Sequence, residues 1–102
     1  MADRIVSLSA KADNDLREII RYIAEHSGDM HAQSVRIRIL KELALLAARP
    51  RIGSRTSDLE PGARCFSLPP WKIFYDPMAT GIEVARIIDS RRDLVALFSR
   101  KP

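Results

Sequence analysis

Two runs of β-branched and aromatic residues, separated by a single turn, occupy much of the last third of the chain. Residues 71–76 (WKIFYD) and 82–88 (IEVARII) flank a segment from Pro77 to Gly81, which is the sequence pattern of a β-hairpin. A charged segment, residues 89–93, follows at once and contains Arg91 and Arg92. Strands of this composition form a rigid platform. We therefore expect the cations beside the hairpin to be held in place and to be important for function.

The first half of the chain predicts one strand and two helices. Residues 5–8 have strand-like composition, and Ser9 is a suitable N-cap for the helix that follows. Gly28 suits the left-handed position at a helix end, and Asp29 suits the cap of a second helix that runs to about Ala48. Apolar residues recur at helical spacing on both sides of this turn: Ala12, Leu16, Ile19, Ile20 and Ile23, then Ala32, Val35, Ile39, Leu43 and Leu46, with Leu40 and Ala47 widening the second stripe. Two helices joined by so short a turn predict an antiparallel hairpin.

The second half predicts a sheet for that hairpin to cover. Residues 50–63 have loop composition, with turns at Ile52-Gly53 and Pro61-Gly62. Strands are expected over 64–68, 71–76 and 82–88, followed by a short C-terminal helix over 92–98. The order is then β-α-α-β-β-β-α, and only the helical hairpin is large enough to cover the sheet. We predict a two-layer α+β fold with the hairpin packed on a mostly antiparallel sheet.

Length and composition favour a single globular domain. The chain has 102 residues, 46% of them hydrophobic, which is enough for one core and predicts one domain over residues 1–102. Its first residues lack the basic start and long apolar run of a targeting segment. No apolar run approaches the roughly 18 residues that span a bilayer. We expect a cytoplasmic protein without membrane contact.

The histidines and the cysteine do not form a recognisable reactive group. Cys65 is the only cysteine and lies in an expected strand, where a small buried side chain is the usual outcome. His26 and His31 lie around the turn between the helices, and their spacing to Cys65 matches no known metal-ligand pattern. We predict no metal site, no cofactor and no catalytic residue.

The candidate contact residues lie in and around the hairpin. The net charge is +4 and the basic excess falls in the second half of the chain, which suits nucleic acid or an anionic protein segment but also an ordinary solvated surface. The candidates for contact with a partner or target are Arg64, Trp71, Tyr75, Arg86, Arg91, Arg92, Asp93, Leu97 and Phe98. Leu97 and Phe98 belong to an apolar stripe with Leu94 that suits either the core or a partner.

Several of these candidates have a structural alternative. Arg64 and Arg86 can pair across the sheet with acids such as Asp76 or Glu83. Trp71 suits an interface or the edge of the core. Tyr75 and its neighbour Phe74 point to opposite faces of a strand, so one is expected in the core while the other can be presented to a partner.

The residues resemble the RelE/ParE superfamily of type II toxin-antitoxin systems, and its ParE branch more closely. The resemblance spans nearly the whole chain and consists of Leu8-Ser9, Ala12, Asp15-Leu16, Ile19 and Tyr22-Ile23-Ala24, then Pro50, Ile52-Gly53, Leu59, Pro61-Gly62 and Arg64, then Ile73-Phe74-Tyr75, Arg86-Ile87-Ile88 and Arg92-Asp93. It implies a toxin that is neutralised by a ParD-like antitoxin. It also implies that the antitoxin, through another domain, is what binds operator DNA.

The two branches of the superfamily imply different targets. RelE-like members are ribosome-dependent mRNA endonucleases, whereas ParE-like members inhibit DNA gyrase. Cleavage of RNA through its 2′-hydroxyl needs groups that move protons as well as cations. Phe98 stands where the RelE-like pattern has a tyrosine, and that branch's lysine-rich segment corresponds here to arginines, which are not deprotonated: Arg49, Arg51 and Arg55. We favour a non-catalytic, gyrase-directed ParE-like toxin, with the endonuclease as the alternative. Asp89 departs from the ParE-like pattern, which often has a histidine there.

Overall fold

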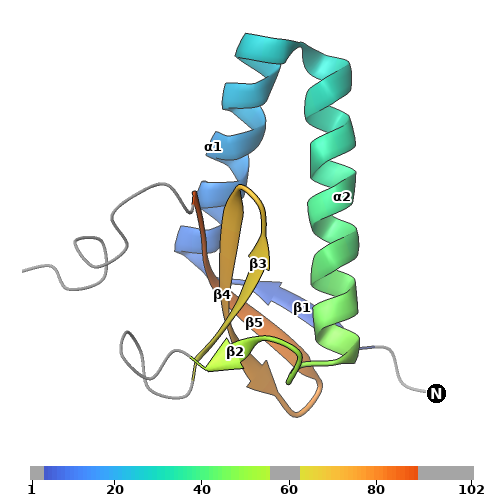
Figure 1. Ribbon diagram of the computed structural model, residues 1–102, viewed down its shortest axis with the longest axis vertical. Helices are drawn as coiled ribbons and strands as arrows, with labels where there is room; N and C mark the ends of the chain where they lie inside the picture. The colour runs from blue at the N-terminus through green and yellow to red at the C-terminus, as the bar shows by residue number, and fades with distance from the viewer. Residues whose placement is uncertain (1–3, 56–62, 90–102) are drawn as a thin grey trace, which may run out of the picture.

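The computed structural model describes residues 4–55 and 63–89 and contains two helices and five strands within them (Figure 1). The elements are β1 (Ile5–Leu8), α1 (Ala10–Ser27), α2 (Asp29–Ala48), β2 (Ser54–Arg55), β3 (Arg64–Leu68), β4 (Trp71–Met78) and β5 (Gly81–Asp89). The two-layer α+β prediction is confirmed. The expected helix over 92–98 and the Pro61-Gly62 turn lie outside the described residues.

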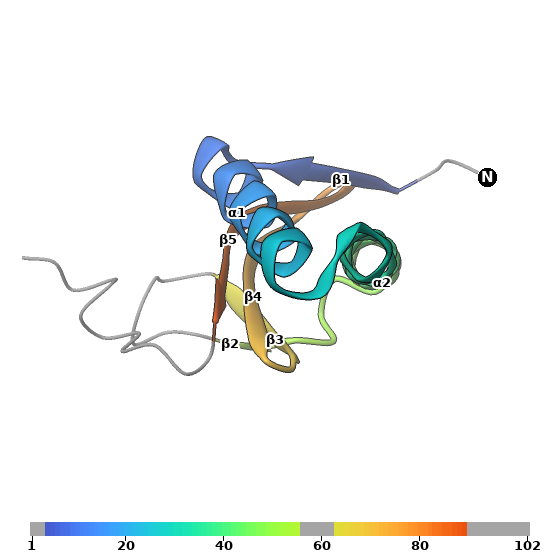
Figure 2. The same ribbon diagram turned by 90° about the horizontal axis from the view of Figure 1, so that it is seen from above.

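The five strands form one sheet in the order β1-β5-β4-β3-β2. β1 runs parallel to β5, and the other three neighbouring pairs are antiparallel, so the sheet is mostly antiparallel, as predicted. Both helices lie on the same side of the sheet, which curves around them (Figure 2). The tip of the helical hairpin extends beyond the sheet (Figure 1). Neither described helix combines the length and the apolar character needed to cross a membrane.

The core lies between the helical hairpin and the sheet. It consists of Ala12 and Leu16 from α1, Val35, Ile39, Leu43, Leu46 and Ala47 from α2, and Leu68, Trp71, Ile73, Tyr75, Ile82, Val84 and Ile87 from the strands. Both predicted stripes therefore contribute to it, but Leu40 does not and is 39% exposed. Successive helical residues are about 100° apart, and this turns Leu40 away from the sheet that its neighbour Ile39 contacts.

The β4–β5 hairpin is longer than the sequence predicts. β4 continues through Pro77 to Met78, and β5 already begins at Gly81, so the turn contains only Ala79 and Thr80. Proline interrupts a strand that has neighbours on both sides, because it has no N–H to donate. β3 pairs with β4 only as far as Tyr75, so Pro77 has a strand neighbour on one side only.

Two local predictions need correction. Asp29 is not the cap of α2 but its first residue, because Gly28 occupies the cap position and offers no side chain. Gly28 has the expected positive φ, at 91°, but an extended ψ of 161°. Ser54 and Arg55 form β2 in a segment expected to be a loop, pairing with Cys65 and Arg64. Two residues are too few to show the alternation that indicates a strand.

Candidate functional site

The strand β5 changes its neighbour halfway along. β1 pairs with it only from Gly81 to Val84, and beyond that point the start of α1 lies against its edge. Ser9 donates its amide to the Val84 carbonyl at 2.9 Å and its hydroxyl to the Ala85 carbonyl at 2.8 Å. The same Ser9 Oγ accepts the amide of Ala12 at 3.0 Å, which confirms it as the N-cap. Ser9 thus starts α1 and attaches it to the sheet.

Asp15 continues this attachment further along α1. Its carboxylate accepts two hydrogen bonds from the Arg86 guanidinium, at 2.7 and 3.0 Å, and one from the Ile87 amide at 2.9 Å. The Arg86 and Asp15 side chains are 23% and 14% exposed, so this is a largely enclosed bidentate pair, the stronger kind of charged hydrogen bond. The hydrogen bond to Asp15 raises the pKa of Arg86, against the opposing effect of burial. Arg86 therefore has its acid on α1, and the expectation of a cross-strand acid is wrong for it.

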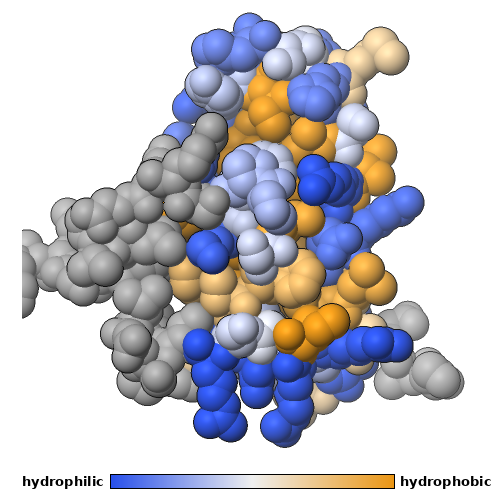
Figure 3. Space-filling view, viewed as in Figure 1, coloured by the Kyte–Doolittle hydropathy of each residue, from blue (hydrophilic) through white to orange (hydrophobic). Residues whose placement is uncertain are grey.

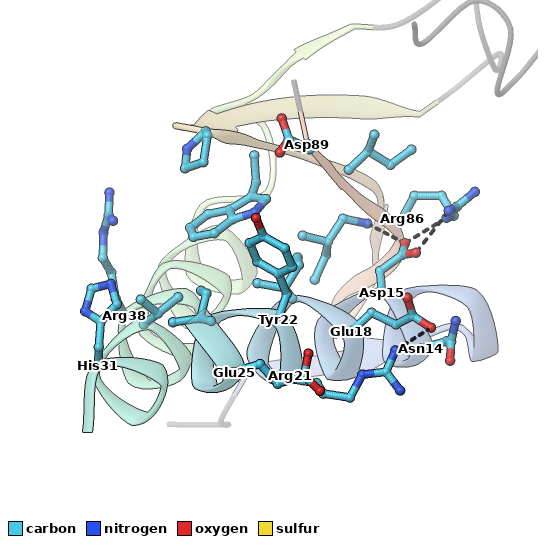
Figure 4. Close-up of a pocket in the computed structure, with 17 residues that line it drawn as sticks. Asn14, Asp15, Glu18, Arg21, Tyr22, Glu25, His31, Arg38, Arg86 and Asp89 are labelled. Atoms are coloured by element: carbon cyan, nitrogen blue, oxygen red, sulfur yellow. Dashed lines mark hydrogen bonds and ion pairs between the residues drawn. The ribbon is translucent and has the colours of Figure 1, made fainter. Parts of the chain in front are cut away.

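A groove of about 690 Å³ lies between α1, the first half of α2, the beginning of β4 and the end of β5. The Asp15–Arg86 pair lies at one end of this groove, and His31 and Arg38 lie at the other (Figure 4). Tyr22 points from α1 toward the strands between these two ends (Figure 4). The groove therefore has a charged group at each end and an aromatic side chain between them, which is suited to a peptide segment rather than to a small apolar molecule.

Two aromatic residues line the groove in different ways. Tyr22 is 62% exposed, and its ring stacks on His26 with the ring centroids 4.0 Å apart. Trp71 is only 7% exposed and belongs to the core cluster. Trp71 thus lies at the edge of the core, which is the second of the two positions that the sequence suggested for it. Its small exposed surface borders the groove.

A second set of contacts attaches the segment after α2 to the sheet. The Tyr75 hydroxyl donates to the Pro50 carbonyl at 2.7 Å and accepts the Gly53 amide at 3.0 Å. Arg64 donates from Nη1 to the carbonyls of Gly53, at 2.6 Å, and Arg51, at 3.2 Å. A Cβ on Gly53 would lie 2.6 Å from the Tyr75 hydroxyl, so only glycine permits this close approach. Burial raises the pKa of Tyr75, which favours the neutral hydroxyl.

The prediction that Phe74 or Tyr75 is presented to a partner is wrong. Their exposed fractions are 4% and 0%. The register of β4 against β5 shifts between them, so that Phe74 pairs with Arg86 and Tyr75 with Val84. Tyr75 lies in the core beneath the helices, where its ring contributes apolar packing and its hydroxyl holds the loop.

Arg64 and Arg86 are not brought together. Arg64 bonds carbonyls after α2, and Arg86 bonds a carboxylate on α1. Of the candidates within the described residues, Trp71 and Arg86 line the groove. Arg64 and Tyr75 do not line it. The other five candidates lie outside the described residues: Arg91, Arg92, Asp93, Leu97 and Phe98.

Asp15, Tyr22 and Arg38 line this groove but were not among the contact residues predicted from the sequence. Asp15 had a usable signal, because it borders the apolar stripe between Ala12 and Leu16, where a carboxylate is partly enclosed. Tyr22 entered only as part of the family resemblance, and Arg38 had no signal, since their common place beside the groove depends on how the two helices pack. Cys65 is half-buried, and burial raises the pKa of its thiol, which disfavours the reactive thiolate.

Comparison with known proteins identifies the family. A family model described as the ParE toxin of a type II toxin-antitoxin system, parDE, matches residues 6–94. The curated Toxin ParE3 of Caulobacter vibrioides is 36% identical over 87 residues, covering 85% of this chain and 87% of that protein. The chain belongs to the ParE toxin family. It is the toxin component of a parDE system, as the resemblance in the sequence implies.

A solved structure agrees with this ParE fold. The chromosomal ParDE toxin-antitoxin system from P. aeruginosa contains a chain that superposes with a TM-score of 0.72 at 20% identity, covering 84% of this chain and 95% of that one. Similarity at this level of identity concerns the fold alone. It confirms the arrangement of a helical hairpin on a mixed sheet.

Proposed function

We propose that this ParE-family chain inhibits DNA gyrase by binding it, without catalysing a reaction, and that a ParD-like antitoxin neutralises it. Membership of the ParE family supports a gyrase target and a partner antitoxin. In this proposal the protein acts in the cytoplasm and meets operator DNA only through the antitoxin. The observation that carries the non-catalytic part is that Arg64 and Arg86 are occupied by separate contacts within the protein.

An RNA-cleaving site needs cations that converge on one phosphate and a nearby group that takes the 2′-hydroxyl proton. Arg86 donates from Nε and Nη2 to the Asp15 carboxylate, and Arg64 donates from Nη1 to loop carbonyls. The Tyr75 hydroxyl is enclosed and bonded to Pro50 and Gly53. His31 carries an imidazole, a side chain that can take a proton, but it lies at the opposite end of the groove from Arg86 (Figure 4). These placements favour inhibition by binding over catalysis.

A supercoiling assay tests the proposal directly. Purified chain added to gyrase, ATP and relaxed plasmid should reduce supercoiling and increase the amount of cleaved DNA, and prior addition of the antitoxin encoded beside it should restore supercoiling. Messenger RNA on translating ribosomes should remain intact at the same toxin concentration. Normal supercoiling together with mRNA cut at defined positions would overturn the proposal in favour of the endonuclease.

A further inference from the structure

The helix α2 has apolar side chains on two opposite faces. One face packs into the core through residues such as Ile39 and Leu43. The other face is exposed, and we call it the outer stripe; it consists of Met30, Ile37, Leu40, Ala44, Leu45 and Ala48. Ile37 is 54% exposed and Leu45 61% exposed. Along the right-hand edge of the molecule, where α2 runs, hydrophobic side chains are visible with hydrophilic ones between them (Figure 3).

The outer surface of α1 differs from this stripe. It carries charged residues, with Arg17 paired to Asp13 at 2.9 Å and Arg21 paired to Glu18 at 3.6 Å. Both helices lie on the same side of the sheet (Figure 2), so their environments are comparable. The exposed apolar side chains are therefore a property of α2, and they are closest together from Ile37 to Ala48, where Lys41 is the polar residue among them. A gathering of exposed apolar side chains rimmed by polar residues marks an interaction site.

Basic residues border the outer stripe. Arg36 and Arg38 lie about 100° to either side of Ile37 on the helix, and Lys41 lies within the stripe one turn later. Arg49 follows directly at its C-terminal end, and all four of these basic residues are exposed. The only acids in α2 are Asp29 and Glu42. A partner that covers the stripe must therefore supply apolar side chains flanked by negative charge.

These charges disfavour a second copy of the chain as the occupant. A two-fold contact places the same surface on both partners. Centred on the stripe, it would bring Lys41 of each copy together and place further cations around them. An amphipathic helix with acidic flanks has the complementary pattern, because its apolar residues meet the stripe while its carboxylates meet Arg36, Arg38 and Lys41.

We propose that the outer stripe of α2 is the docking surface for an acidic, amphipathic helix of the antitoxin. The proposal rests on the proposed function, which supplies the antitoxin, and it assigns the antitoxin's helix to α2 rather than to the groove beside α1. The apolar contacts provide most of the affinity, and the bordering cations set the orientation and accelerate association.

Apolar truncation is the first test. The purified antitoxin encoded beside this chain is titrated into the unchanged toxin and into the Ile37→Ser/Leu45→Ser double variant. The variant should bind at least about tenfold more weakly, which corresponds to about 1.4 kcal/mol. Ile5→Ser is the matched control, because Ile5 is 52% exposed against 54% for Ile37. Its neighbour Val6 packs on the core, so Ile5 points to the opposite face of the sheet, and its removal should change the affinity by less than about twofold.

Charge reversal is the second test. Lys41→Glu should slow association with the antitoxin about tenfold at low salt, and this difference should shrink as the salt concentration rises. Lys11→Glu, on the exposed side of α1, is the matched control and should associate at nearly the unchanged rate. Thermal unfolding of every variant confirms that the fold is retained, which the exposure of these positions leads us to expect.

The outcomes separate this proposal from the proposed function. If the unchanged toxin binds the antitoxin and the outer-stripe variants bind equally well, the docking surface is wrong while the toxin assignment stands. If Tyr22→Ser abolishes binding and the stripe variants do not, the groove is the docking surface. If Ile37→Ser/Leu45→Ser removes only self-association in sedimentation, or only binding to phosphatidylglycerol vesicles, a second copy or a membrane is the occupant. If the unchanged toxin binds no antitoxin, both proposals fail.

Discussion

The two ends of the helical hairpin are attached to the sheet by opposite kinds of chemistry. Near the start of α1, the ionised pair of Asp15 and Arg86 closes the edge of β5. After the end of α2, neutral contacts from the Tyr75 hydroxyl, supplemented by Arg64, hold the loop carbonyls. We refer to these as the charged attachment and the neutral attachment. Each contains an arginine that sequence reasoning assigned to target contact.

We expect these two arginines, both predicted from the sequence to contact a target, to contribute unequally to the stability of the fold. Loss of Arg86 leaves a carboxylate that is only 14% exposed without its counter-charge, and an enclosed unpaired charge is costly. Loss of Arg64 leaves carbonyl groups, which are neutral and lie in a partly exposed loop where water can replace the guanidinium. The charged attachment should therefore be the more sensitive of the two.

The largest effect is expected from Arg86→Gln. Breaking an enclosed ion pair from one side costs about 3–5 kcal/mol, and the partial exposure of this pair places the expected loss of unfolding free energy near the lower limit. Arg64→Gln is the matched control and should cost about 1 kcal/mol. Urea denaturation of both variants measures the difference.

The Asp15→Asn/Arg86→Gln double variant refines this result. It removes both charges together, so its loss of stability should be smaller than the sum of the two single losses. Equal losses for Arg86→Gln and Arg64→Gln would mean that the charge of the Asp15 pair does not distinguish the two attachments.

Tyr75→Phe should have the next largest effect. It keeps the ring in the core but leaves the Gly53 amide and the Pro50 carbonyl without their shared partner, and unsatisfied enclosed groups cost about 1–3 kcal/mol. We expect a loss of about 2 kcal/mol in urea denaturation. Tyr22→Phe, at a position 62% exposed, is the control and should change stability by less than about 0.5 kcal/mol. A neutral Tyr75→Phe result would show that water reaches these loop groups.

Much of the architecture follows from the periodicity of the sequence. The apolar stripes around Gly28 predict both helices, and the alternating run from Trp71 predicts the hairpin that forms the centre of the sheet. Residues in these elements contact near neighbours along the chain, so local pattern is informative. The exceptions depend on tertiary neighbours. β4 extends past Pro77 because β3 has already ended. The Tyr75 hydroxyl is enclosed because the loop after α2 covers it with the Pro50 carbonyl and the Gly53 amide.

The candidate site could be predicted only in part, for the same reason. Arg86 and Trp71 were identified as important, but the sequence does not show that Asp15, 71 residues away, supplies the partner of Arg86. Leu40 was assigned to the core stripe of α2, but it is exposed. It belongs to a second apolar face of the helix, and the sequence pattern alone does not separate the two faces. Contacts between distant segments therefore account for the errors.

The smallest effect, and the one that separates the two attachments by pH, is expected in alkaline solution. Burial raises the pKa of Tyr75 above its unfolded value of about 10, so the folded protein holds this proton more tightly. The resulting stability is fully present below about pH 10 and is lost as the pH rises through the folded pKa, by at most about 1.4 kcal/mol per pH unit for one proton. The half-buried Cys65 behaves in the same way from about pH 9. The pKa of Arg86 is raised further above this range, so the charged attachment does not titrate there.

In a Cys65→Ala background, urea denaturation between pH 9 and about pH 11 should show a decline of the unfolding free energy with pH. Tyr75→Phe should reduce this decline, and Arg86→Gln should leave it unchanged. A decline that follows Arg86 instead would reverse the assignment of neutral and charged chemistry to the two attachments.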